Sequence, residues 1–255
     1  MKKLLAITAL LLCSAFTVSA QESAKPQMNF VKFNLTSLLL KNYSLQYERV
    51  LSKSISAAIS FRFMPYTTVP FKSSIIDMAK IEDQETIDMF NTAQFANYSI
   101  TPEIRFYLGK KGYGRGFYIA PYYRYASYET QNLEFSFEIG DEEEQMSQTQ
   151  KIDLSGSLTS HTGGIMFGVQ WALGKHVSLD WWLLGAAYGV SSGVINGIPT
   201  PAISQEDIPK VKQELEEMDI PMVEKTVTVT SNNVRMDLTG PWAGIRSGIV
   251  IGIKF

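Results

Sequence analysis

Residues 55–64 read Ile-Ser-Ala-Ala-Ile-Ser-Phe-Arg-Phe-Met, and this stretch carries the pattern that decides the fold. Residues 55, 57, 59, 61 and 63 are apolar, and residues 56, 58, 60 and 62 between them are small or, at Arg62, charged. Side chains of a β-strand point alternately to its two faces, with a period of two. The stretch therefore predicts a strand with one apolar face and one polar face.

The same alternation recurs along the chain in segments of a length suited to membrane strands, which need about ten residues. With residues 55–64, the segments are 30–40, 43–50, 98–108, 117–128, 164–173, 177–184 and 245–255. A strand that crosses a membrane places apolar side chains toward lipid and polar or small ones toward the interior. We therefore predict an all-β fold, a closed antiparallel eight-stranded transmembrane β-barrel.

The connections between these segments are of two kinds. Those near Ser52, Lys111 and Lys175 are tight, whereas residues 65–97, 129–160 and 190–240 form long connections. Outer-membrane barrels have short periplasmic turns and long external loops, and this alternation of lengths fits them. An even number of strands places both termini on the periplasmic side. Within the last long connection, Asp207, Pro209, Val211, Leu215 and Met218 predict a helix that ends before Pro221. A second short helix is expected within residues 75–90.

A soluble β-sandwich would also alternate, so the two faces must be compared. The second face carries charges of both signs, which would make a poor dry core. Tyr and Trp lie near strand ends, where a membrane interface favours them. The chain contains no run of about 18 apolar residues, so no transmembrane helix is predicted.

The N-terminus has the pattern of a secretory signal peptide. Lys2 and Lys3 precede the apolar run 4–12, and Val18-Ser19-Ala20 offers small residues for cleavage before Gln21. We expect residues 1–20 to be the signal peptide and 21–255 the barrel domain. The single cysteine, Cys13, lies in the signal, and a lipoprotein would need a small residue before it in place of Leu12. A net charge of −2 gives no basic excess for binding nucleic acid.

The end of the chain resembles the C-terminal assembly signal of bacterial outer-membrane proteins. That signal has apolar residues at alternate positions before a final aromatic residue, here Ile249, Ile251, Ile253 and Phe255. The resemblance implies recognition by the barrel-assembly machinery and a place in the cell outer membrane. The mature chain as a whole is similar to barrels of the OmpA, OmpX and OmpW type. Residues 101–107 and 240–244 resemble stretches of a Gram-negative barrel family of unknown function.

The polar faces carry the candidate interior site. We expect an ion-pair network of Lys32, Glu48, Arg62, Glu103, Arg105, Arg124, Asp180 and Arg246, with Lys254 on the same face. Buried charges persist only when they are paired, so the network predicts a plugged barrel. Because cations outnumber acids on this face, a gated and weakly anion-selective path is the alternative.

Two prolines occupy unusual places inside predicted strands. Pro102 and Pro121 cannot donate a hydrogen bond to the sheet, and both share the lipid-facing parity. If both face the seam between their strands, that seam lacks two hydrogen bonds and could open laterally for apolar ligands. The alternative is a pair of β-bulges that shape the wall.

No enzyme is predicted, and we expect neither a cofactor nor a metal. His161 beside Ser160, with Asp153 upstream, could suggest a lipid A-modifying enzyme. The acidic run Glu138, Asp141, Glu142, Glu143 and Glu144 is typical of a solvated loop, with weak Ca²⁺ binding as the alternative. The sequence favours a non-enzymatic monomer with a structural or surface-interaction role. Its expected partners are outer-membrane lipid, lipopolysaccharide and an unidentified surface partner.

Overall fold

The computed structural model describes residues 27–139, 148–217 and 222–255. Its nine strands are β1 Asn29–Asn34, β2 Tyr43–Val50, β3 Ile55–Thr68, β4 Gln94–Tyr107, β5 Gly116–Ile139, β6 Gln148–Ala172, β7 Val177–Thr200, β8 Glu224–Thr230 and β9 Asn233–Lys254. The described helices are α2 Leu35–Leu39, α3 Lys72–Ala79, α4 Gln84–Thr92 and α5 Ile208–Glu217. Within the described residues, no helix combines the length and apolar character needed to cross a membrane. The signal peptide expected at residues 1–20 lies outside the described residues.

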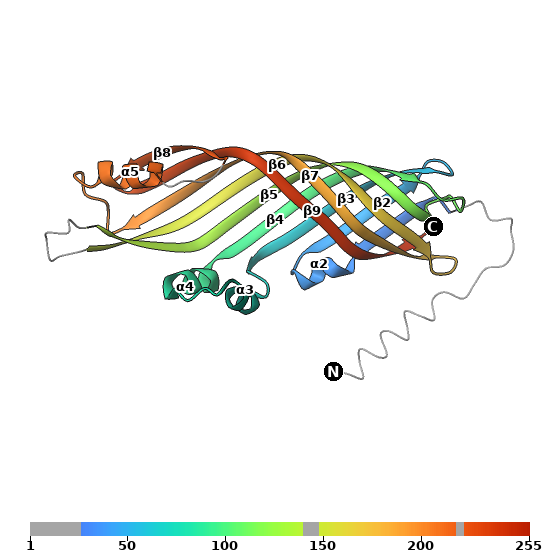
Figure 1. The fold of residues 1–255 in the computed structure, drawn as a ribbon, viewed down its shortest axis with the longest axis horizontal. Helices are drawn as coiled ribbons and strands as arrows, with labels where there is room; N and C mark the ends of the chain where they lie inside the picture. Colours follow the sequence, from blue (N-terminus) through green and yellow to red (C-terminus); the bar gives the residue numbers. More distant parts are fainter. Residues whose placement is uncertain (1–26, 140–147, 218–221) are drawn as a thin grey trace, which may run out of the picture.

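All nine strands belong to one antiparallel sheet that closes into a ring (Figure 1). Consecutive strands pair from β1 to β7, β7 then pairs with β9, and β9 pairs with β1. At the closing seam the backbone groups of Asn29 and Phe255 exchange two hydrogen bonds of 3.0 Å. β8 pairs with β9 alone, where β9 begins. The ring is thus closed between the first and last strands of the chain.

The two ends of the ring differ in their connections. The tight turns at residues 51–54, 108–115 and 173–176 lie at the same end as Asn29 and the C-terminus, which we call the turn end. The longer connections carry α3, α4 and α5 at the other end, which we call the helix end (Figure 1). The sequence predicted this division into short and long connections.

Each predicted segment contains part of one strand of the sheet, namely β1 to β7 and β9, but the predicted limits need correction. Residues 129–160 and 190–240, expected as loops, are largely strand, because β5, β6, β7 and β9 continue far toward the helix end. The outward positions there become polar, as at Glu129 and Asp153, so the apolar alternation ends while backbone pairing continues. β8 was not predicted for the same reason.

Two local features also differ from the expected pattern. The segment 30–40 is not one strand: β1 ends at Asn34, whose side chain accepts a hydrogen bond from Ser37 N at 3.1 Å and caps α2. In β7, pairing with β6 shifts by one residue at Leu183. Leu184, which strict alternation with Trp182 would place on the inner face, therefore points outward and is 52% exposed.

The expected helices are present at the helix end. Val211 of α5 is buried in a small apolar cluster with Ile152 and Val234, and Leu215 packs against this cluster. The helix expected between residues 75 and 90 is a pair, α3 and α4. Met218 and Pro221, expected at the end of α5, lie outside the described residues.

The two faces of the closed sheet have opposite character. Large apolar side chains on the outer face are about half exposed, as at Ile59 (50%), Phe61 (49%) and Ile165 (51%). Polar and charged side chains on the inner face are buried. The neighbours Trp181 and Trp182 illustrate the contrast, because the first is 48% exposed and the second 1%. We call the outer belt the apolar band; it includes Val31, Leu45, Ile59, Phe61, Ile100, Ile104, Phe106, Ile165, Phe167, Trp181, Ile249, Ile251 and Ile253.

Glycines on the inner face make room for aromatic rings. Along one line of paired residues, Tyr107 of β4 lies beside Tyr118 of β5, then comes Gly168 of β6, then Trp182 of β7. The tyrosine rings have centroids 5.3 Å apart, and the Tyr118 side chain leans over Gly168. Large and small residues therefore alternate around the ring and fill its interior, as close packing requires.

We predict that Gly168→Ala destabilises the fold by about 1–3 kcal/mol, the usual cost of overpacking a filled core. A Cβ at Gly168 would overlap the Tyr118 hydroxyl, and the fully buried ring has no space to withdraw. Gly163→Ala in the same strand is the matched control, because a Cβ there meets no atom within 4 Å. Urea midpoints of the two refolded variants measure the difference, and equal midpoints would show that the interior is not tightly filled.

Candidate functional site

The interior near the turn end holds a connected group of six charged side chains, which we call the charge network. Its cations are Lys32, Arg105 and Arg246, and its carboxylates are Glu48, Glu103 and Asp180. The three positive and three negative charges balance. Exposure of the six side chains is between 0% and 3%. Water therefore does not reach this level of the ring.

Arg105 is the centre of the charge network. Its guanidinium group bridges Asp180 at 2.6 Å, Glu103 at 2.6 Å and Glu48 at 3.2 Å. Lys32 pairs with Glu48 and, at 2.8 Å, with Asp180. Several partners for each buried charge offset the cost of removing it from water.

Neutral side chains add hydrogen bonds to the charged groups of the network. The Tyr107 hydroxyl donates to Glu48 at 2.7 Å, and the Tyr118 hydroxyl donates to Asp180 at 2.8 Å. Gln46 donates to Glu103 at 3.1 Å, and Gln170 accepts from Lys32 at 2.6 Å. Strands on all sides of the ring are thus joined through its interior.

Arg246 extends the charge network toward the helix end. It binds Glu103 at 2.5 Å and lies 3.9 Å over the ring of Trp182, a cation–π contact. Arg105 lies 4.5 Å over Tyr118 in the same manner. These contacts explain why large aromatic residues share the interior with charges.

Arg62 and Arg124, which the sequence placed in the network, form no ion pair with any acid among the described residues. Arg124 donates to Ser99 Oγ at 3.1 Å, while its buried Nε has no partner. Their outward neighbours are tyrosines and phenylalanines, and the acids of the interior lie nearer the turn end. The expected network therefore divides into a balanced group and a separate pair of arginines, which we call the arginine pair.

The prolines occupy one seam of the sheet. β3 pairs with β4 through Pro102, and β5 pairs with β6 through Pro121. Between β4 and β5 the register is identical on both sides of the prolines, but neither proline is paired across this seam. Because the register is constant, there is no β-bulge at either proline, so the alternative prediction of two bulges is wrong. The missing hydrogen bonds of both prolines fall in the seam between β4 and β5.

The last residues of the chain lie at the closing seam. Ile249, Ile251 and Ile253 point outward from β9 and Phe255 is 55% exposed. Ile251 and Ile253 pair with Phe33 and Val31 of β1. The stretch that resembles an assembly signal therefore also supplies the strand that closes the ring.

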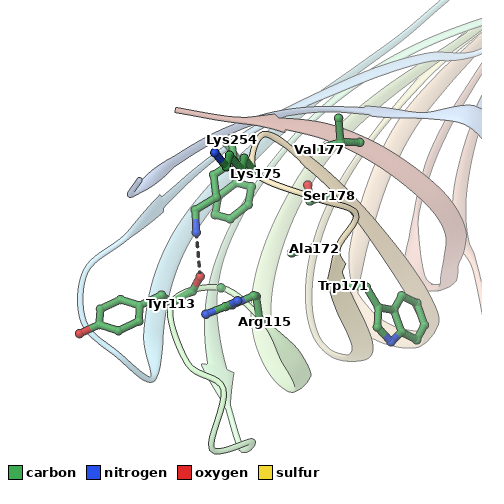
Figure 2. A pocket seen from close by; sticks show the side chains of 11 residues that line it. Tyr113, Arg115, Trp171, Ala172, Lys175, Val177, Ser178 and Lys254 are labelled. Carbon is green, nitrogen blue, oxygen red and sulfur yellow. Dashed lines mark hydrogen bonds between the residues drawn. The ribbon is translucent and has the colours of Figure 1, made fainter. Parts of the chain in front are cut away.

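A shallow basic cavity of about 260 Å³ lies at the turn end (Figure 2). Arg115, Lys175 and Lys254 line it, and Lys254 Nζ donates to the carbonyl oxygen of Tyr113 at 3.5 Å. Lys254, expected on the inner face, therefore lies at the rim rather than in the charge network. No described carboxylate lines this cavity.

The structure separates the residues of the possible enzyme site. His161 points outward, where the Tyr123 hydroxyl lies 2.6 Å from its Nδ1, whereas Ser160 points inward and is 1% exposed. Asp153 lies eight positions away along β6, about 26 Å at the rise of a strand. These three residues do not form a nucleophile, base and acid arrangement.

Other predicted features carry no site in the described part of the chain. The described residues contain no group of three or more His, Cys, Asp or Glu side chains that could hold a metal ion. Asp141 to Glu144 of the acidic run lie outside the described residues, as does the placement of the Glu138 side chain.

Comparison with known proteins gives one finding. The model of a family described as "Protein of unknown function (DUF3575)" matches residues 6–192, which is most of the chain. No curated protein matches the chain.

We predict that Asp180→Asn lowers stability by about 3–5 kcal/mol, because it leaves buried cations without their balancing charge. The matched control is Asp237→Asn, which removes an exposed pair with Arg235 at 2.7 Å. Solvent screens that pair, so little change is expected. Urea unfolding measures both variants. Similar losses in the two would mean that the interior charges are hydrated rather than buried.

Proposed function

We propose that this chain, which belongs to the DUF3575 family of proteins of unknown function, is a non-enzymatic outer-membrane β-barrel with a structural or surface-interaction role. In this proposal the ring of β1 to β7 and β9 is an eight-stranded barrel that crosses the membrane. β8 and α5 belong to an extension outside the membrane.

The apolar band is the observation that carries the proposal. It encircles the closed sheet, and its side chains are half exposed in the isolated chain. Monomeric proteins in water rarely expose a continuous apolar patch of more than a few hundred Å². Contact with lipid acyl chains would bury the band, and the closed ring would leave no unpaired strand edge in the bilayer.

The orientation follows from the two ends. Both barrel termini and the tight turns lie at the turn end, which in our proposal faces the periplasm. Lys110, Lys111, Arg115 and Lys175 stand there, where their ammonium and guanidinium groups could reach phospholipid headgroups. The helix end, with the extended strands, would face outward and offer the surface for a partner.

The charge network argues for a structural barrel rather than an open channel. Barrels of eight strands have an interior that side chains can fill. Here the ion pairs are fully buried, and they link β1 and β2 with β4, β7 and β9 across the interior. The same filled interior disfavours the anion-selective path that the excess of cations suggested.

Extraction of outer membranes with detergent, followed by gel electrophoresis with and without boiling, tests the proposal. We expect the mature protein in the outer-membrane fraction, with the unboiled form migrating differently from the boiled one. A protein found in the soluble periplasmic fraction would overturn the proposed location.

Ile59→Arg tests the contact of the apolar band with lipid. An arginine at the bilayer midplane of a barrel costs about 2–4 kcal/mol, so we expect less folded protein in the membrane. Met78→Arg in α3 is the control, because Met78 is 82% exposed and lies outside the ring. If the band faced water, Ile59→Arg would be as harmless as the control.

A conduit for small apolar molecules is the second candidate, favoured by the two prolines in one seam. Two missing hydrogen bonds there would lower the cost of a lateral opening between β4 and β5. Replacing both prolines with valine restores the donors, and we expect slower uptake of an apolar dye through the outer membrane. Unchanged uptake would rule out this route.

A further inference from the structure

A cavity of about 340 Å³ lies inside the ring, on the helix-end side of the charge network. Its lining is mostly apolar and includes Phe95, Tyr128, Leu158, Ile195, Leu238 and Trp242. Glu129 also borders it, and its exposed carboxylate accepts a hydrogen bond from the Tyr66 hydroxyl at 2.6 Å. These side chains come from five strands, β4, β5, β6, β7 and β9. They are partly exposed, so small molecules can reach them. The volume falls at the lower end of the range of small-molecule sites, about 300–1,000 Å³.

Aromatic contacts confirm that the cavity is internal. The rings of Tyr128 in β5 and Trp242 in β9 lie 5.3 Å apart, although β6 and β7 separate these strands in the sheet. Only side chains that point into the ring can meet across two intervening strands. We call this space the inner cavity.

The strand register places the arginine pair between the charge network and the residues that line the inner cavity. Arg124 is on the same face of β5 as Tyr128. It pairs with Thr162 of β6, which pairs with Gly189 of β7, which pairs with Trp242 of β9. Arg124 and Trp242 therefore lie on one line of paired residues across the sheet. Gly189 has no side chain to fill the interior between them. The Tyr128 side chain, which lines the cavity, is close enough to Arg62 and Arg124 to interact electrostatically with both.

Small residues leave space beside Arg62. The line of paired residues that begins at Arg62 continues through Ser99, Ala126, Ser160, Ser191 and Gly240. Most of these are buried and none is large, so few bulky side chains compete with the guanidinium groups for the interior at this level. An anion placed there could accept hydrogen bonds from both arginines.

The charges call for such an anion. Arg62 and Arg124 lie near Arg246, whose charge Glu103 already balances, and no described acid pairs with either of them. Neighbouring like charges that are partly withdrawn from water repel one another, and a counter-charge between them lowers this cost. We propose that the inner cavity binds a fatty acid, with its single chain against the apolar lining and its carboxylate at the arginine pair.

This inference goes beyond the proposed function, because it concerns the interior of the ring and does not depend on what surrounds the barrel. A single-chain carboxylate fits better than a headgroup with several chains, since the cavity is small and two neighbouring guanidinium groups can bind one carboxylate. Charge complementarity, rather than apolar area alone, selects this ligand.

Fluorescence quenching in phosphatidylcholine nanodiscs tests the proposal. The background variant is Trp171→Phe/Trp181→Phe, which removes the outward tryptophans and keeps Trp182 and Trp242. The probes are terminally brominated undecanoate and the matching brominated undecanol. We expect saturable quenching by the acid, with a midpoint about tenfold lower than that of the alcohol, equivalent to about 1.4 kcal/mol. Equal midpoints for the two probes would overturn the proposal.

Three further variants in this background identify the site. Trp242→Phe should remove the saturable quenching, and Arg62→Gln/Arg124→Gln should raise the midpoint of the acid to that of the alcohol. Ile195→Phe, which narrows the cavity but keeps both arginines, should weaken both probes. Acid binding unchanged by the arginine variant would contradict the proposal. If that variant fails to fold, as judged by gel migration before boiling, the comparison of the acid and alcohol midpoints in the background variant still tests the proposal.

Discussion

Closure of the sheet by β1 and β9 is the constraint on which the rest of the structure depends. Once the backbone of Asn29 binds that of Phe255, every strand of the ring has a neighbour on both sides. An inner face then exists that water reaches only from the ends, and charged side chains placed there must find partners within the protein. Arg105 shows the consequence, because its single guanidinium group is shared by three carboxylates from β2, β4 and β7.

Alternation along each strand links this interior to the outer surface. A residue on the inner face has chain neighbours on the outer face: Trp182 lies against Arg246 inside the ring, whereas Trp181 belongs to the apolar band. One inserted residue exchanges the two faces, and the shift at Leu183 does so: the inward residues of β7 are even-numbered up to Trp182 and odd-numbered from Gly185 onward. In our proposal the same alternation allows one strand to satisfy both lipid outside and charge inside.

The sequence predicted much of this arrangement and missed parts with clear physical reasons. Period-two alternation located a strand in each predicted segment, and the parity of Lys32, Glu48 and Asp180 identified inner positions. It did not reveal that Asn34 would cap a helix, because that depends on one side-chain hydrogen bond. It also missed β8 and the strand extensions, where polar outward residues hide the pattern. The separation of Arg62 and Arg124 from the acids depends on the register between strands, which spacing along one strand does not supply.

The central claim is that the apolar band touches acyl chains while the polar face turns inward. Variants that retain only Trp181 or only Trp182, placed in bilayers of lipids with brominated acyl chains, test it directly. The account predicts strong quenching of Trp181, which points outward, and weak quenching of its neighbour Trp182, which is buried beside Arg246. Equal quenching of the two, or none of Trp181, would contradict it.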